Sequence, residues 1–127
     1  MKTIEDVERL EKILGQLQAA HAEATILAKK APADSLNSFK LKLINKVIEE
    51  SNKVLGQRYK PFEEFDEFED DDIPSNSDVT MILAQYMEEA ERYRSDNVTP
   101  VHGRWYYVVD GEPSEISSGM PSKVGKK

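Results

Sequence analysis

A long, narrow apolar stripe near the N-terminus places the strongest constraint on how this chain folds. Its members recur at alternating spacings of three and four residues: Val7, Leu10, Leu14, Leu17, His21, Ala24 and Ala28. This spacing predicts a helix from about residue 3 to residue 30, capped by Thr3 with Asp6 and stopped by Pro32. Because such a helix cannot bury the stripe alone, it needs a second helix of the same chain or another subunit.

Two more helices are predicted further along the chain. One begins at Asp34 or Ser35 and ends at Gly56, and its apolar face comprises Leu36, Phe39, Leu43, Val47, Ile48, Val54 and Leu55. The other begins within residues 76–78 and ends near Asp96, and its buried stripe comprises Val79, Ile82, Leu83, Tyr86, Met87 and Ala90. We expect both helices to contribute to the core.

The pattern changes from helix to strand after Pro100, which we expect to act as a breaker. Aromatic and β-branched residues predict a strand over 104–109, and Asp110–Gly111 predicts a tight turn before a second short strand at about 115–117. Because an isolated hairpin is marginal in water, these strands must pack on a helix or join a sheet completed by another subunit. The predicted fold is α+β: long N-terminal helices, an acidic loop, a third helix and a C-terminal β-hairpin, completed by homo-oligomerisation.

The 127 residues fit a single domain, 1–127, that ends in a basic tail at 119–127. The formal charge is −7, but eight of the acidic side chains lie in the run Glu63–Asp72, so the rest of the chain carries 16 acidic against 17 basic side chains. This distribution argues against a large basic face for duplex nucleic acid but leaves room for a compact nucleotide pocket. The run lacks the glycine and the acid spacing of an EF-hand, which favours a solvated loop or one that docks on a basic partner.

Residues suited to catalysis are few. The chain has no cysteine and two histidines, His21 in the apolar stripe and His102 in a predicted turn. Neither has a partner at a recognisable spacing, and no GxSxG, Walker or GxGxxG pattern occurs. We therefore expect a protein that is not an enzyme and that has no cofactor or metal. Without cysteine, a membrane-length apolar run or a signal-peptide pattern, it is expected to be cytoplasmic and away from membranes.

A scattered set of side chains would suit a nucleotide-like ligand. It comprises cations, aromatics and an amide near the ends of the predicted elements: Arg58, Lys60, Tyr86, Tyr93, Arg94, Asn97, Arg104 and Trp105. Aromatic faces stack on bases, cationic groups pair with phosphates, and an amide reads a base edge or a ribose hydroxyl. Each residue also fits an ordinary structural role, such as a core aromatic or a helix-end cation, so both interpretations stay open.

Seven short blocks in a fixed order carry a resemblance to a known family. They are Leu41–Glu50, Tyr59–Phe62, the acidic run, Ser75–Val79, Gln85–Tyr86, Arg94–Asn97 and Trp105–Gly111. In this order the chain resembles the phage anti-Thoeris sponge proteins, the first described of the Thoeris anti-defence families. The resemblance extends from about Ser38 to Lys127, and the helix predicted over 3–30 lies outside it.

The resemblance implies a phage protein that acts inside an infected bacterium. Such proteins bind the cyclic ADP-ribose isomers made by TIR-domain sensors and withhold them from the effector without cleaving them. Some also bind cyclic di- or trinucleotides at a separate site. They are homo-oligomers whose ligand pockets form where protomers meet, so the resemblance implies a dimer or a hexamer here.

The resemblance also assigns ligand-binding residues. It places the helix aromatic at Tyr86 or Met87 and the polar group at the helix exit at Asn97, and it places the strand aromatics at Trp105 and Tyr106. The family has an arginine–threonine pair followed by prolines near the C-terminus, whereas this chain reads Ser117-Ser118-Gly119-Met120-Pro121. The implied set therefore includes Ser118, and phosphate recognition moves to Lys123, Arg104 or Arg58.

Two alternatives come from other classes of function. One is a small protein–protein inhibitor whose acidic run mimics nucleic acid or docks on a basic surface of a host defence or nucleic-acid-binding protein. The other is a helical assembly protein, an interpretation that rests on the stripe from Val7 to Ala28 alone.

Overall fold

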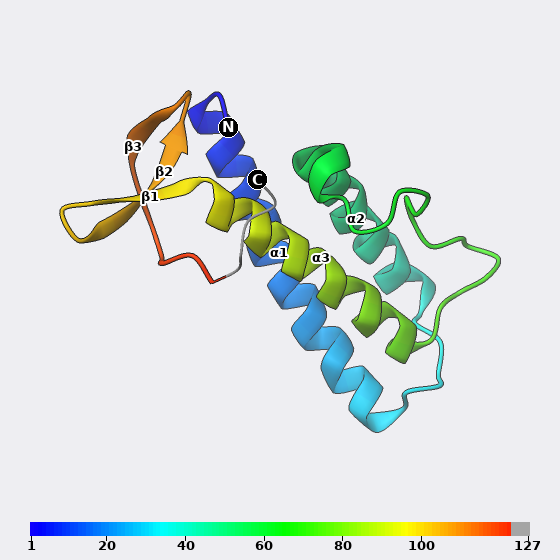
Figure 1. Ribbon diagram of the computed structural model, residues 1–127. Helices are drawn as coiled ribbons and strands as arrows, with labels where there is room; N and C mark the ends of the chain where they lie inside the picture. The colour runs from blue at the N-terminus through cyan, green and yellow to red at the C-terminus, as the bar shows by residue number, and fades with distance from the viewer. Residues whose placement is uncertain (123–127) are drawn as a thin grey trace.

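The computed structural model describes residues 1–122. Three long helices are followed by a three-stranded antiparallel sheet at one end of the molecule (Figure 1). The elements are α1 (Ile4–Lys30), α2 (Ser38–Tyr59), α3 (Asn76–Asp96), β1 (Val98–Val101), β2 (Arg104–Val109) and β3 (Glu112–Ser118). The predicted α+β class, with its order of helices, loop and strands, is confirmed.

The apolar stripe of α1 packs against α3 of the same chain (Figure 1). Its buried members are Val7, Leu10, Ile13, Leu17 and Ala24, and they meet the α3 residues Val79, Leu83, Tyr86 and Ala90, which are fully buried. Ile13 takes the place predicted for Leu14, because the stripe turns slightly around the helix. Each large apolar side chain buried in this way contributes about 1.5–3 kcal/mol. The predicted capping box of Thr3 and Asp6 is confirmed.

The beginning of α2 was predicted wrongly. Asn37 is the N-cap, and the helix begins at Ser38 rather than near Asp34. Residues 34–36 are extended instead, because they bond to the chain that enters α3: Asn76 N–H donates to Asp34 O at 2.8 Å and Leu36 N–H donates to Pro74 O at 3.2 Å. These two hydrogen bonds attach the α1–α2 connection to the start of α3.

Gly56 bends α2 instead of ending it. Its φ of +65° and ψ of −173° are not helical, yet one more turn continues to Tyr59. Glycine adopts this left-handed φ without the steric cost that a Cβ brings. The bend carries the Tyr59 ring to α3, where it stacks on Tyr93 with the ring centroids 4.8 Å apart and its hydroxyl bonds to Asp96.

The predicted apolar face of α2 is only partly buried. Leu36, Ile48 and Leu55 are in the core as expected, but Phe39 is 70% exposed and Leu43 is 53% exposed. The helix has two apolar stripes, and the one that includes Leu41, Ile44 and Ile48 faces the core. The other stripe, with Phe39 and Leu43, is left on the surface.

The C-terminal sheet has one strand more than predicted. β1 pairs with β2, and β2 pairs with β3, each in antiparallel register. The prediction missed β1 because it contains Pro100, but β1 is an edge strand, where the absent N–H of proline costs no ladder bond. Both connections are two-residue turns with positive φ, at His102–Gly103 and Asp110–Gly111, as tight hairpins require.

The sheet is fixed to the helices at two points, one in β2 and one at the end of β3. Tyr107 of β2 is fully buried, and its hydroxyl donates to Glu11 Oε1 of α1 at 2.5 Å. Arg94 of α3 donates to Ser118 Oγ at 2.7 Å and to the carbonyl oxygens of Gly119 and Met120, each at 2.9 Å.

Within residues 1–122, no helix has both the length and the apolar character needed to cross a membrane.

Glu91 completes this attachment and gives it a pH dependence. Burial of the Glu91 carboxyl disfavours its charged form, but hydrogen bonds from Arg94, Ser122 and Ser95 outweigh the burial and lower the pKa of Glu91 below its usual 4.5. Arg94 Nη2 lies 2.6 Å from Glu91 Oε2. The stabilisation is therefore complete above pH 4.5 and is lost as the pH falls through the lower pKa of the folded state.

We predict that Gly15→Ala stabilises the protein by about 0.5–1 kcal/mol, because glycine weakens a helix interior by that amount. No described atom lies within 4 Å of a Cβ built at Gly15. Gly56→Ala is the matched control, and it should lower the free energy of unfolding, because alanine is strained at a φ of +65°. Urea denaturation measures both, and a destabilised Gly15→Ala would contradict the open surface around that position.

We predict that Glu91→Gln lowers stability at pH 7 and that the difference from the native chain shrinks as the pH falls from 5 to 3. Protonation removes the same charge that the substitution removes. The measurement is chemical denaturation at a series of pH values. Glu8→Gln, at an exposed position of α1, serves as control and should change stability little at any pH. A Glu91→Gln difference that is constant with pH would exclude the ionised carboxylate as its source.

Candidate functional site

A trench follows the boundary between α1 and α2, with α3 at its base. Three adjoining hollows form it, with volumes of about 330, 410 and 380 Å³. Arg9, Glu50 and Val54 line both the first and the second hollow, and Val47 lines both the second and the third. α1 packs mainly against α3, whereas α2 contacts both helices, and the opening lies along the boundary between α1 and α2.

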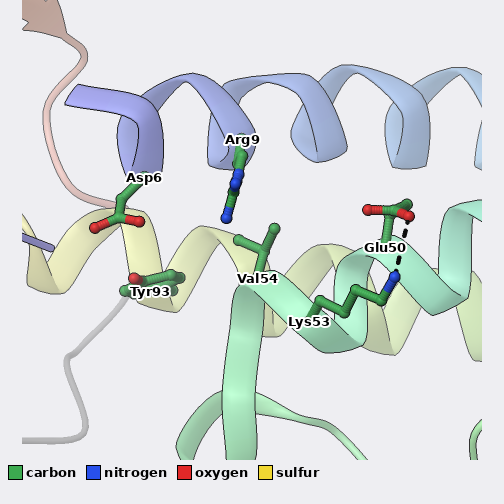
Figure 2. Close-up of a pocket in the computed structure, with 6 residues that line it drawn as sticks. All are labelled: Asp6, Arg9, Glu50, Lys53, Val54 and Tyr93. Atoms are coloured by element: carbon green, nitrogen blue, oxygen red, sulfur yellow. Dashed lines mark ion pairs between the residues drawn. The ribbon is translucent and has the colours of Figure 1, made fainter. Parts of the chain in front are cut away.

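The first hollow, called here the charged pocket, is lined by Asp6, Arg9, Glu50, Lys53, Val54 and Tyr93. Figure 2 shows Arg9 extending from α1 toward Val54 of α2, between Tyr93 on one side and the Glu50–Lys53 pair on the other. Lys53 Nζ lies 3.5 Å from Glu50 Oε1 and 3.5 Å from Glu49 Oε1. Arg9 forms no salt bridge with the residues that the structure describes.

Tyr93 provides the aromatic surface of the charged pocket. Its ring stacks against the ring of Tyr59, which holds it in place. Burial, with a smaller contribution from the charge of Asp6, raises the pKa of Tyr93. The phenol is therefore neutral at physiological pH and offers a hydroxyl next to the stacked ring.

Asp6 is held at the rim as part of the α1 cap. Its Oδ2 accepts from the backbone N–H groups of Lys2 at 2.9 Å and Thr3 at 3.1 Å. These hydrogen bonds lower the pKa of Asp6, and the one from Lys2 has the largest effect. The pocket thus combines two cations, two carboxylates and a phenol. Such a set suits a ligand that carries phosphate, hydroxyl and aromatic groups together.

Arg58 and Lys60, predicted to bind the ligand, lie beyond the bend of α2. The Arg58 guanidinium carbon is 5.7 Å from the centroid of the Tyr59 ring. Lys60 bonds to the acidic run, with its Nζ 2.7 Å from Asp66 Oδ1 and 3.1 Å from Glu63 O. Neither residue lines the charged pocket.

Tyr86 and Asn97 already have partners within the chain. Tyr86 is fully buried, its hydroxyl donates to Asn52 Oδ1 at 2.7 Å, and burial raises the pKa of Tyr86 to about 12. Asn97 is the C-cap of α3, where its Nδ2 donates to Tyr93 O at 2.8 Å and its Oδ1 accepts from the Met1 amine at 3.3 Å. A ligand that bound either group would have to replace these contacts.

The predicted residues of the sheet do not share one surface. Arg104 lines an outer hollow of about 610 Å³ together with His102 and Tyr106, whereas the next side chain, that of Trp105, points to the opposite face, as alternation along a strand requires. Trp105 pairs with Ser118 across β2 and β3, and Ser118 Oγ accepts from Arg94. Lys123 lies outside the described residues.

The charged pocket was missed in the sequence because its residues carry no local signal. Arg9 and Lys53 occupy exposed positions of two helices, where charged residues normally face water. Tyr93 alone belonged to the predicted set. Only the packing of α1 and α2 on α3 brings these side chains together.

Comparisons with known proteins identify no relative of this chain: no family model, no curated protein and no solved structure matches it. Within residues 1–122, no three histidine, aspartate or glutamate side chains are placed to hold a metal ion together, the acidic run included.

Proposed function

We propose that this protein binds a nucleotide second messenger and sequesters it without cleaving it, in the cytoplasm of an infected bacterium. The ligand class is that of the cyclic ADP-ribose isomers made by TIR-domain sensors, with cyclic oligonucleotides as a further class. The observation that carries the proposal is the charged pocket, where Arg9 of α1 lies between the Tyr93 ring on one side and Lys53 of α2 on the other. The block order from Ser38 onward, which resembles the anti-Thoeris sponge proteins, supports the same class of ligand.

The chemistry of the pocket favours storage of a ligand over its turnover. Its described lining contains no histidine, cysteine or serine side chain to act as a nucleophile or as a base near neutral pH. Arg9 and Lys53 supply charge for a pyrophosphate, and the carboxylates of Asp6 and Glu50 accept from ribose hydroxyls. A sponge needs only tight and slow binding, for which such a set is sufficient.

We also propose a homo-oligomer, a dimer or a hexamer, as the resemblance implies. The outer face of the sheet supports this proposal. It has a broad hollow that includes Arg104 and Tyr106, and the described sheet covers only three strands. Protomers that met there would bring Arg104 and Tyr106 of two chains together.

We predict that Arg9→Gln and Lys53→Gln each weaken nucleotide binding about tenfold or more, because each removes a charged hydrogen bond of about 1.5–3 kcal/mol. Isothermal titration with cyclic ADP-ribose isomers and cyclic oligonucleotides measures the affinity, and denaturing the complex should release the ligand intact. Both positions are exposed, so the fold is expected to survive. Arg104→Gln is the matched control on the sheet.

Each outcome of this titration has a distinct meaning. Binding that is lost in Arg104→Gln and kept in Arg9→Gln would move the site to the sheet. No binding of any of these ligands would refute sequestration, and release of a cleaved ligand would make the protein an enzyme.

A second candidate function, inhibition of a basic partner protein, has one observation in its favour. The acidic run is held in a defined shape: the Asn45 side chain donates to Phe68 O at 2.9 Å and accepts from Phe68 N–H at 2.8 Å, and Lys60 pairs with Asp66. The acidic side chains of the run are exposed.

This function predicts that replacing the acids of Glu63–Asp72 with their amides abolishes anti-defence activity, whereas sequestration predicts that nucleotide binding is retained.

A further inference from the structure

Beyond the charged pocket, the trench becomes an apolar groove. This groove is the third hollow, and its walls include Ala19, Ala20 and Leu27 of α1 and Phe39, Leu43 and Val47 of α2. Phe39 and Leu43 are more than half exposed. Monomeric proteins seldom expose contiguous apolar surface of this kind without a binding role.

The second hollow, in the middle of the trench, has a different character. Arg9, Lys12 and Lys46 line it together with the apolar side chains of Ile13 and Val47. None of the three cations forms a salt bridge with a described residue, and Glu50, the acid of this hollow, is paired with Lys53. In a chain with a net charge of −7, this hollow is a local positive surface beside an apolar one.

The dimensions of the trench fit a helix. Along α2 the lining extends from Phe39 to Val54, which corresponds to about 22 Å, or about four turns, at a rise of about 1.5 Å per residue. Two helices that separate above a third leave the position that a fourth helix occupies in a bundle. An amphipathic helix binds in such a groove through apolar residues spaced three and four apart.

We propose that the trench binds an acidic amphipathic helix of a partner protein. The apolar residues of that helix contact Phe39, Leu43 and the alanines of α1, and its carboxylates, about two turns further along, pair with Lys12 and Lys46. The charged pocket and the middle hollow share Arg9, Glu50 and Val54, but the residues that test this inference, Lys12, Lys46 and Leu43, do not line the charged pocket.

Charge also decides between this partner and a second copy of the chain. The exposed apolar stripe of α2 is flanked by lysines, at positions 40, 42 and 46. Of these, Lys40 is paired with Glu23 at 3.0 Å, and a second copy that met this stripe would bring further lysines to it. Like charges in contact across an interface are unfavourable, whereas a helix with glutamates meets the same surface with opposite charge.

The test uses two synthetic 18-residue helical peptides with the same apolar positions. One carries glutamates where the helix faces the middle hollow, and the other carries lysines there. Fluorescence anisotropy with the full chain should show at least about tenfold tighter binding of the glutamate peptide. The double variant Lys12→Glu with Lys46→Glu should reverse this preference, and Leu43→Ser should weaken both peptides.

A control variant and a measurement of folding accompany the peptide titrations. Met81→Ser, at a 58% exposed position of α3 outside the trench, should change neither affinity, and circular dichroism verifies that each variant is folded. Equal affinity for the two peptides, or a preference that survives charge reversal, would overturn the proposal. Sedimentation that shows self-association lost in Leu43→Ser would assign the groove to a second copy and would also overturn it. Nucleotide binding unchanged in Leu43→Ser leaves the proposed function standing in either case.

Discussion

The contact between α1 and α3 is the interaction on which the rest of the structure depends. The two helices bury each other's apolar stripes, from Val7 to Ala24 on one and from Val79 to Ala90 on the other. α2 then packs on the same pair, and the sheet is fixed at their end through Tyr107 and Arg94. Because α3 contacts both other helices, its loss would leave α1 and α2 with only their contact with each other.

The trench is a consequence of this arrangement. α1 and α2 both pack against α3, and their sides that face away from α3 diverge. The hollows lie between those sides. The bend at Gly56 carries the last turn of α2 down to α3, where Tyr59 supports the Tyr93 ring. The same packing that forms the core therefore places a supported aromatic ring, two cations and an apolar strip along one open surface.

Much of this fold is present in the sequence as periodicity. The stripe of α1, the capping box at Thr3, the extent of α3 and the strand from Arg104 follow from local patterns, and each is confirmed. What failed depends on contacts between distant segments. Asp34 and Ser35 have good capping side chains, but the backbone bonds of residues 34–36 to Pro74 and Asn76 hold this segment extended.

Local sequence patterns also did not decide between structures that fit them equally well. α2 has two apolar stripes, and only the tertiary packing shows that Ile44 faces inward while Leu43 faces outward. Pro100 is compatible with an edge strand as well as with a break. The charged pocket joins Arg9 to Lys53 across two helices, and no spacing in either helix marks these residues as different from solvated charges. The predicted ligand residues remain a hypothesis, and all of them except Lys123 lie in the described part of the chain.

The long distance in sequence between α1 and its partners has a consequence for synthesis. Glu11 bonds to Tyr107, which is 96 residues further along the chain, and the stripe of α1 is covered only when α3 has been made. At about 5–20 residues per second, a ribosome needs several seconds to reach that point. During this interval α1 presents its apolar stripe without the α3 residues that cover it in the folded protein.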